Sequence, residues 1–144
     1  MKKYYGALTV VLVAVLMLTG CGANENVLRC TGEEMGADIS VEARFRNDQL
    51  RRVEMVTTYD FSALGVEGEM LDQMREILDA SCEMFDEEGF TCRTDVSGNY
   101  AKMFLTIDVD ADSEEALEHL GLEEDELTYA AVREFWEDSG FVCQ

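Results

Sequence analysis

The sequence predicts an α+β domain in which an antiparallel sheet, built from two hairpins plus terminal strands, carries two main helices packed on it. Three observations predict this class. Apolar and polar residues alternate over 37–46, 53–61 and 101–109, as they do in half-buried strands. Apolar residues recur at three- and four-residue steps over 69–88 and 128–139, as in amphipathic helices. The junctions are rich in Asn, Asp, Ser and Gly, and the chain has no proline.

The first hairpin is predicted over residues 37–61, after a short strand at 27–31. Asn47 and Asp48 tolerate the dihedral angles of the turn that joins its two strands. Leu50 has the wrong parity, so either a bulge near Arg51 and Arg52 shifts the register or Leu50 belongs to the turn. The inward-facing residues of the two strands are Ala37, Ile39, Val41, Ala43 and Phe45, and Val53, Met55, Thr57, Tyr59 and Phe61.

Residues 69–88 predict the first main helix, and a second hairpin follows it. Gly89 suits a left-handed helix C-cap, and Phe90 supplies the apolar residue that packs back on the last turn. Strands are predicted at 90–96 and 101–109, with a tight turn at 97–99. The apolar stripe of the helix consists of Leu71, Met74, Leu78, Cys82 and Phe85, and Met70, Ile77 and Met84 widen it.

The C-terminal part predicts a short helical turn near 113–120 and a second main helix at 128–139. Thr128 can cap this helix, whose apolar side carries Tyr129, Val132, Phe135 and Trp136. The segments MFDEEGFTC (84–92) and FWEDSGFVC (135–143) share one plan of helix end, glycine cap, phenylalanine and cysteine. Two copies indicate a common capping device rather than a repeat architecture.

The N-terminus predicts a lipid anchor. Lys2 and Lys3 precede an apolar run at 7–18, which is typical of a signal peptide and too short to cross about 30 Å of hydrocarbon. Leu18-Thr19-Gly20-Cys21 resembles the lipobox of bacterial lipoproteins, in which cleavage precedes a cysteine that receives diacylglycerol. We therefore expect a cleaved signal peptide at 1–20, lipidation of Cys21, a short linker at 21–26 and a single globular domain at 27–144. The lipid would hold this domain on the outer face of the bacterial membrane.

The other four cysteines predict two disulfides, because that compartment permits them. Zinc is disfavoured, since no C-x₂-C or H-x₃-H spacing occurs. Cys82 and Cys92 each lie about 10 Å from Gly89, one along the helix and one along the strand, so they come level and should pair. By elimination Cys30 pairs with Cys143, which requires the terminal strands to be neighbours.

Charge and motifs exclude several functions. Without the signal peptide the chain carries nine basic and 31 acidic residues, a formal net charge of −22, which disfavours nucleic acid and anionic headgroups as partners. The only histidine, His119, is expected on a solvated helix face, and no nucleophile–base motif or phosphate loop occurs. We therefore expect no enzyme activity and no cofactor.

A stretch of alternating acids at 108–114 suggests calcium, because Asp108, Asp110, Asp112 and Glu114 have the spacing with which a calcium loop begins. As an EF-hand it fails, since position six would be Ser113 instead of glycine and position twelve His119 instead of glutamate. We expect no metal site, and keep a calcium- or cation-dependent surface module as the alternative function.

The order of these elements resembles the YehR-like lipoproteins, small bacterial lipoproteins of unknown function. The matching segments are the lipobox at 18–21, the hairpin at 37–65, KMFLTIDVD at 102–110 and LTYAAVREFWEDSGF at 127–141. Four cysteines beyond the lipobox depart from the family pattern. The resemblance implies an α+β fold and no catalytic residues. We expect a monomeric, lipid-anchored extracytoplasmic domain that acts by binding or envelope support, with a ligand that the sequence does not name.

Overall fold

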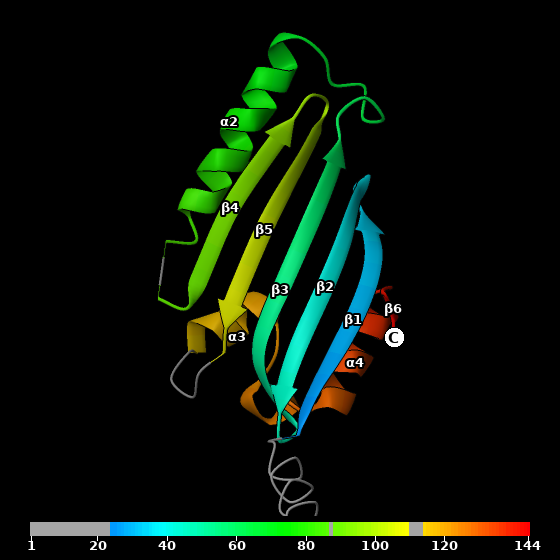
Figure 1. Ribbon diagram of the computed structural model, residues 1–144, viewed down its shortest axis with the longest axis vertical. Coiled ribbons are helices and arrows are strands. Elements are labelled where there is room, and N and C mark those ends of the chain that lie inside the picture. Colours follow the sequence, from blue (N-terminus) through cyan, green and yellow to red (C-terminus); the bar gives the residue numbers. More distant parts are fainter. Residues whose placement is uncertain (1–23, 87, 110–113) are drawn as a thin grey trace, which may run out of the picture.

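The alternating segments of the sequence pair into one antiparallel sheet, which takes the largest share of the computed structural model (Figure 1). The structure describes residues 24–86, 88–109 and 114–144. Within them the order of the six strands is β4-β5-β3-β2-β1-β6. The strands are β1 (Glu25–Glu34), β2 (Ala37–Arg46), β3 (Gln49–Asp60), β4 (Phe90–Ser97), β5 (Tyr100–Asp108) and β6 (Val142–Cys143).

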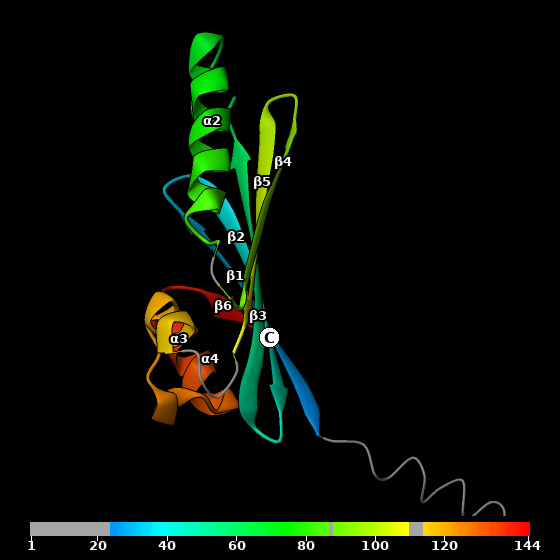
Figure 2. The ribbon, with the colours of Figure 1, turned by 90° about the vertical axis from the view of Figure 1, so that its left-hand side faces the viewer.

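All helices of the described chain lie on one face of this sheet, as the side view shows (Figure 2). They are α2 (Glu69–Glu83), α3 (Glu114–Leu120) and α4 (Tyr129–Asp138), with the 3₁₀ turn η1 (Glu124–Glu126) before α4. Helix α2 runs along β4, whereas α3 and α4 cover the opposite end of the same face (Figures 1 and 2). We call the other side of the sheet, on which none of the described helices lies, the open face.

The predicted α+β arrangement of two main helices packed on a sheet of two hairpins and terminal strands is wrong. Six strands dominate the described chain, and three α-helices share one face. The difference arises at 114–120, where the sequence indicated only a helical turn. This segment is a helix that buries Ala116, Leu117 and Leu120. Seven residues are too few to display a helical period, so the sequence concealed a third packing element.

The core lies between the sheet and its helices, in two clusters. The larger cluster joins β1, β2, β3 and β5 to α3 and α4, and the smaller one joins Phe61 and Ala101 to Leu78 of α2. Phe45, Phe61 and Leu28 are the largest fully buried side chains. The predicted inward-facing residues of β2 are therefore buried or half-buried, as their alternation requires.

The hairpin of β2 and β3 contains a bulge at Arg51. Arg44 pairs with Arg52 while Phe45 pairs with Leu50, so Arg51 is the extra residue. The shift turns Leu50 inward, where 2% of it is exposed. The first of the two alternatives for Leu50 is thus confirmed. The turn itself uses Asn47 and Asp48 at φ 52° and 58°, which Asn and Asp tolerate better than most residues.

The ends of several elements differ from the prediction. Strand β1 extends beyond 27–31 at both ends, and α2 ends at Glu83 rather than at 88. Gly140 has φ of 91° directly after the C-cap of α4, so the predicted glycine cap is confirmed there. The predicted cap at Gly89 is wrong, because α2 ends with Met84 as its C-cap, although Gly89 does have a positive φ of 90°. Thr128 caps α4, since its hydroxyl accepts a hydrogen bond of 3.4 Å from the Ala131 N–H.

Candidate functional site

The helix-bearing face contains a groove of about 450 Å³ beside the C-terminal end of α4. Its base comes from β1, β2 and β3, and its sides from α3, the end of α4 and the segment that leads into β6. We call it the aromatic groove. Its lining residues are Gly32, Glu33, Glu34, Ile39, Met55, Leu120, Phe135, Trp136, Ser139, Gly140 and Phe141.

Three aromatic rings form one side of the aromatic groove. The ring of Trp136 meets Phe135 and Phe141 edge-on, with centroid distances of 5.4 and 5.0 Å. Such edge-to-face contacts stabilise aromatic clusters beyond their buried area. Phe141 lies directly over the backbone of β1, because a Cβ atom at Gly32 would be 2.8 Å from its ring. Glycine at position 32 is therefore needed for this packing.

Trp136 also carries an unsatisfied polar atom. Its side chain is 7% exposed, and its indole Nε1–H is buried without a hydrogen-bond partner among the described residues. A buried donor without an acceptor is unfavourable by roughly 1–3 kcal/mol. Trp136 lines the aromatic groove, so this unsatisfied donor belongs to a residue of its wall.

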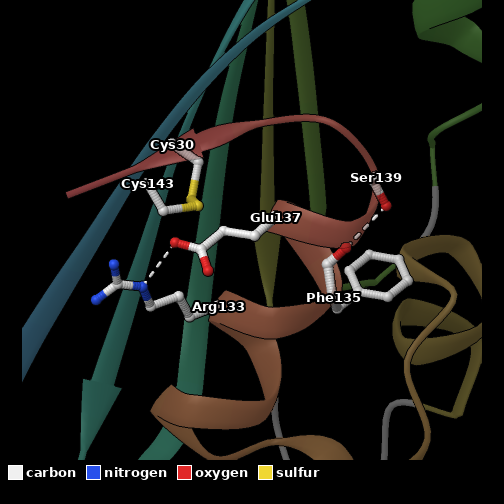
Figure 3. Close-up of a disulfide and its surroundings, with 6 residues drawn as sticks. All are labelled: Cys30, Arg133, Phe135, Glu137, Ser139 and Cys143. Carbon is white, nitrogen blue, oxygen red and sulfur yellow. Dashed lines mark hydrogen bonds and ion pairs between the residues drawn. A yellow bond between two sulfur atoms is a disulfide. The ribbon is translucent and has the colours of Figure 1, made fainter.

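A disulfide fixes the outer wall of the groove to the sheet (Figure 3). Cys30 in β1 and Cys143 in β6 are bonded, with their Cα atoms 4.0 Å apart. Between α4 and β6, Ser139 donates its hydroxyl to the Phe135 carbonyl at 2.8 Å, and the Phe141 N–H donates to the Trp136 carbonyl at 3.0 Å. The short connection therefore holds Phe141 between an ordered helix end and a covalently attached strand.

The second predicted pair also lies within bonding distance. Cys82 of α2 and Cys92 of β4 are bonded, with Cα atoms 5.2 Å apart. Next to them, Phe90 contacts Phe85 with a centroid distance of 6.1 Å. His119 is exposed, as predicted for a helix face, but its ring also packs edge-on against both phenylalanines. His119 is 37 residues from Cys82 in the sequence, so the sequence did not indicate that it lies near this disulfide.

On the open face, charged side chains form a continuous ladder across four strands. Arg29 of β1 pairs with Glu42 of β2 at 3.1 Å, and Arg44 pairs with Glu42 at 2.7 Å. Arg52 of β3 donates to Asp108 of β5 at 2.7 Å. The middle of the ladder is completed by Glu54, which lies 3.8 Å from both Arg44 and Arg52. The hydrogen bond that Arg52 donates to Asp108 and the negative charge of that carboxylate raise the pKa of Arg52 above its ordinary value.

The acidic stretch at 108–114 forms no recognisable calcium loop in the part of it that the structure describes. Asp108 faces Arg52 across the sheet, and Glu114 belongs to the first turn of α3. Asp110, Asp112 and Ser113 lie outside the described residues. Among the residues that are described, no three His, Cys, Asp or Glu side chains are grouped to hold a metal ion.

The predicted signal peptide and the lipidation site Cys21 lie outside the described residues, which begin at Asn24. No helix in the described ranges has the length and apolar character that a membrane crossing requires. The first described residue is well fixed, because its carbonyl accepts a 2.9 Å hydrogen bond from the Asn47 N–H.

Sequence reasoning missed the aromatic groove. Phe135 and Trp136 were assigned to the apolar side of a helix and Phe141 to a helix cap, so all three had a structural explanation. The available signal was their concentration, since three of the chain's aromatic residues fall within seven positions.

Comparison with known proteins supports the fold. No protein-family model and no curated protein matches the chain. The NMR structure of the Escherichia coli YehR protein superposes with a TM-score of 0.64 at 18% identity, over 85% of this chain and 92% of that one. An NMR structure of a protein from Streptococcus pneumoniae TIGR4 gives a TM-score of 0.46 at 14% identity, over 84% and 86% of the two chains. The chain therefore has a YehR-like fold.

Proposed function

We propose that this protein is a lipid-anchored extracytoplasmic binding domain of the YehR-like lipoproteins, which holds an apolar or aromatic ligand in the aromatic groove without chemical conversion. The aromatic groove is the observation that carries the proposal. Ligand sites are typically concave and mostly apolar, with a few polar groups that orient the ligand. The groove combines three aromatic rings with two carboxylates, Glu33 and Glu34, at its border.

Anchoring is supported by the lipobox and by the short distance from Cys21 to the domain. Two residues separate Cys21 from Asn24, whose carbonyl is held by a hydrogen bond from the Asn47 N–H in the β2–β3 turn. A lipidated Cys21 would therefore keep the domain at the membrane surface. The fold shared with YehR supports the assignment to the same group of lipoproteins.

Anchoring is tested by the variant Cys21→Ser. The wild-type protein should partition into the detergent phase, and mass spectrometry should find acyl chains on its first mature residue. The serine variant should remain unprocessed or enter the aqueous phase. More than one acyl chain is expected, because a single chain anchors only marginally. Equal detergent partitioning of processed wild type and variant would refute the lipid anchor.

Ligand binding is tested with N-phenyl-1-naphthylamine, an uncharged aromatic probe. Trp136 is the only tryptophan of the chain, so energy transfer from it to the probe reports binding near the groove. We would use the chain from Asn24 onward, which avoids partitioning of the probe into lipid. Saturable transfer with a one-to-one endpoint is expected.

A matched pair of variants locates the probe. Ser139→Phe adds an aromatic ring to the groove lining, whereas Ser97→Phe adds the same ring at an exposed position near the β4–β5 turn. Ser139→Phe should weaken probe binding about tenfold, which corresponds to ~1.4 kcal/mol, because its ring takes up space in the groove. Ser97→Phe should leave the affinity unchanged. Equal affinity of both variants and the wild type would refute binding in the aromatic groove.

A further inference from the structure

The open face carries a concentration of arginines at the end of the sheet where β1 begins. We propose that this surface docks on the anionic headgroups of the bilayer that holds the lipid anchor, and so sets the orientation of the domain. This inference rests on the lipid anchor of the proposed function. The net charge of the chain alone predicts repulsion from anionic headgroups. The inference differs because the charges are unevenly distributed over the surface.

The arginines line one concave surface of about 640 Å³. Four of them surround it, against a single carboxylate, Glu25. All four are exposed. We call this concave surface the arginine pocket, and its lining residues are Glu25, Asn26, Val27, Arg44, Phe45, Arg46, Arg51 and Arg52. The lining has a formal charge of +3, which falls to zero when Glu42, Glu54 and Asp108, the partners of Arg44 and Arg52 on the open face, are included. Even so, this end of the open face is far less acidic than the chain as a whole, whose formal charge without the signal peptide is −22.

The arginine pocket lies close to the predicted anchor. Glu25 pairs with Arg46 in the sheet register, and Arg46 also forms an ion pair of 3.3 Å with the Glu25 carboxylate. The three steps along the chain from Cys21 to Asn24 span at most about 10 Å when fully extended. This maximum reach slightly exceeds the Debye length of about 8 Å at physiological salt, so the headgroups act strongly on these charges only when the domain lies directly against the bilayer.

The acids at this end that do not pair with the arginines include three on the helix-bearing side of the sheet. The turn η1 and the start of α4 are held beside the β2–β3 turn, because the Leu50 N–H donates to the Leu127 carbonyl at 2.9 Å. Glu123, Asp125 and Glu126 are therefore close to this end but on the helix-bearing side. An anionic surface attracts the arginine pocket and repels η1. Both forces turn the open face toward the bilayer.

The chemistry of arginine suits this contact. A guanidinium group can bind two phosphate oxygens at once, and it is weakly hydrated compared with an ammonium group. The present partners of these arginines, Glu25, Glu42, Glu54 and Asp108, form exposed ion pairs. Exposed pairs contribute little free energy, so an arginine can exchange a carboxylate for a lipid phosphate.

The test reconstitutes the full lipidated protein into nanodiscs, either of phosphatidylcholine alone or with phosphatidylglycerol at 30 mol%. Phenylglyoxal then modifies arginines, and mass spectrometry measures the rate at each site. We expect a rate at least about twofold lower in the anionic discs at each arginine of the pocket: Arg44, Arg46, Arg51 and Arg52. Each arginine near an anionic leaflet contributes roughly fivefold to affinity, so these side chains should spend most of the time in contact with headgroups. Arg75 of α2, near the opposite end of the sheet, should react equally in both discs and is the internal reference.

Two variants of equal charge complete the test. Arg46→Gln with Arg51→Gln should abolish the protection of Arg44 and Arg52, whereas Arg75→Gln with Arg133→Gln should leave it intact. Absence of protein from the discs would refute the anchor itself. If the protein co-purifies with both kinds of disc but its arginines react equally fast in both, the docking surface is refuted and the lipid anchor is not. Equal protection by inorganic phosphate in phosphatidylcholine discs would also overturn it, because the arginine pocket would then be a site for free anions.

Discussion

Removal of the bond between Cys30 and Cys143 should destabilise the domain more than removal of the bond between Cys82 and Cys92. The two bonds close loops of very different length, with sequence separations of 113 and 10 residues. In the chain-entropy model the longer loop contributes about 4.8 kcal/mol and the shorter one about 2.7 kcal/mol. We therefore expect the two double variants to differ by about 2 kcal/mol in free energy of unfolding.

Alanine is the suitable replacement, since Cys30 and Cys143 are 1% and 9% exposed and a serine hydroxyl would be buried without an assured partner. Urea unfolding at pH 7 would be followed for Cys30→Ala with Cys143→Ala and for Cys82→Ala with Cys92→Ala. The slope of the transition should also be larger without the long-range bond, because the unfolded chain can expand further. An equal or greater loss for the Cys82–Cys92 pair would refute the reasoning from loop length.

Three further outcomes are expected. Phe45→Ala should lower the free energy of unfolding, measured in urea, by about 3–5 kcal/mol, because Phe45 is 2% exposed and contacts the Tyr129 ring. A loss under about 1 kcal/mol would contradict the place of Phe45 in the core. Burial raises the pKa of Tyr59 above the ordinary 10.0, so its stabilising effect is full below pH 10 and is lost as pH rises through its folded pKa. Absorbance at 295 nm should show that Tyr59→Phe removes a late transition, and removal of one at or below pH 10 would contradict the shift. The melting temperature should rise from low to moderate salt because of the net charge of −22; a much larger rise with calcium than with sodium at equal ionic strength would instead indicate a site at 108–114.

The sequence was most informative where one face of an element is buried and the other is solvated. Strict alternation placed β2 at its observed bounds, and the parity of Leu50 located the bulge to within a residue. Alternation works because a strand exposes every second residue, so a single shift in register is visible in the residue types. Both cysteine pairs agree with the prediction, but the reasoning for Cys82 and Cys92 assumed a helix that continues to Gly89, whereas α2 ends at Glu83. The pair of Cys30 and Cys143 followed only by elimination.

The sequence was less informative about what covers an apolar residue. Met70, Ile77 and Met84 continue the apolar stripe of α2, yet they remain 54%, 56% and 74% exposed because the helix covers only the β4 side of the sheet. The aromatic groove was hidden for the same reason. The helical period shows which residues of α4 are apolar, but the space beside Phe141 depends on where α3 and α4 end.

The bond between Cys30 and Cys143 also determines what a protease could release from the cell surface. A single cut anywhere between these two residues would leave the C-terminal fragment covalently attached to β1, and so to the lipid if Cys21 is modified. That fragment would carry Phe135, Trp136 and Phe141 when the cut falls before α4. For any such cut, release of the groove wall would require reduction as well as cleavage, whereas a cut between Cys21 and Cys30 would release the whole domain.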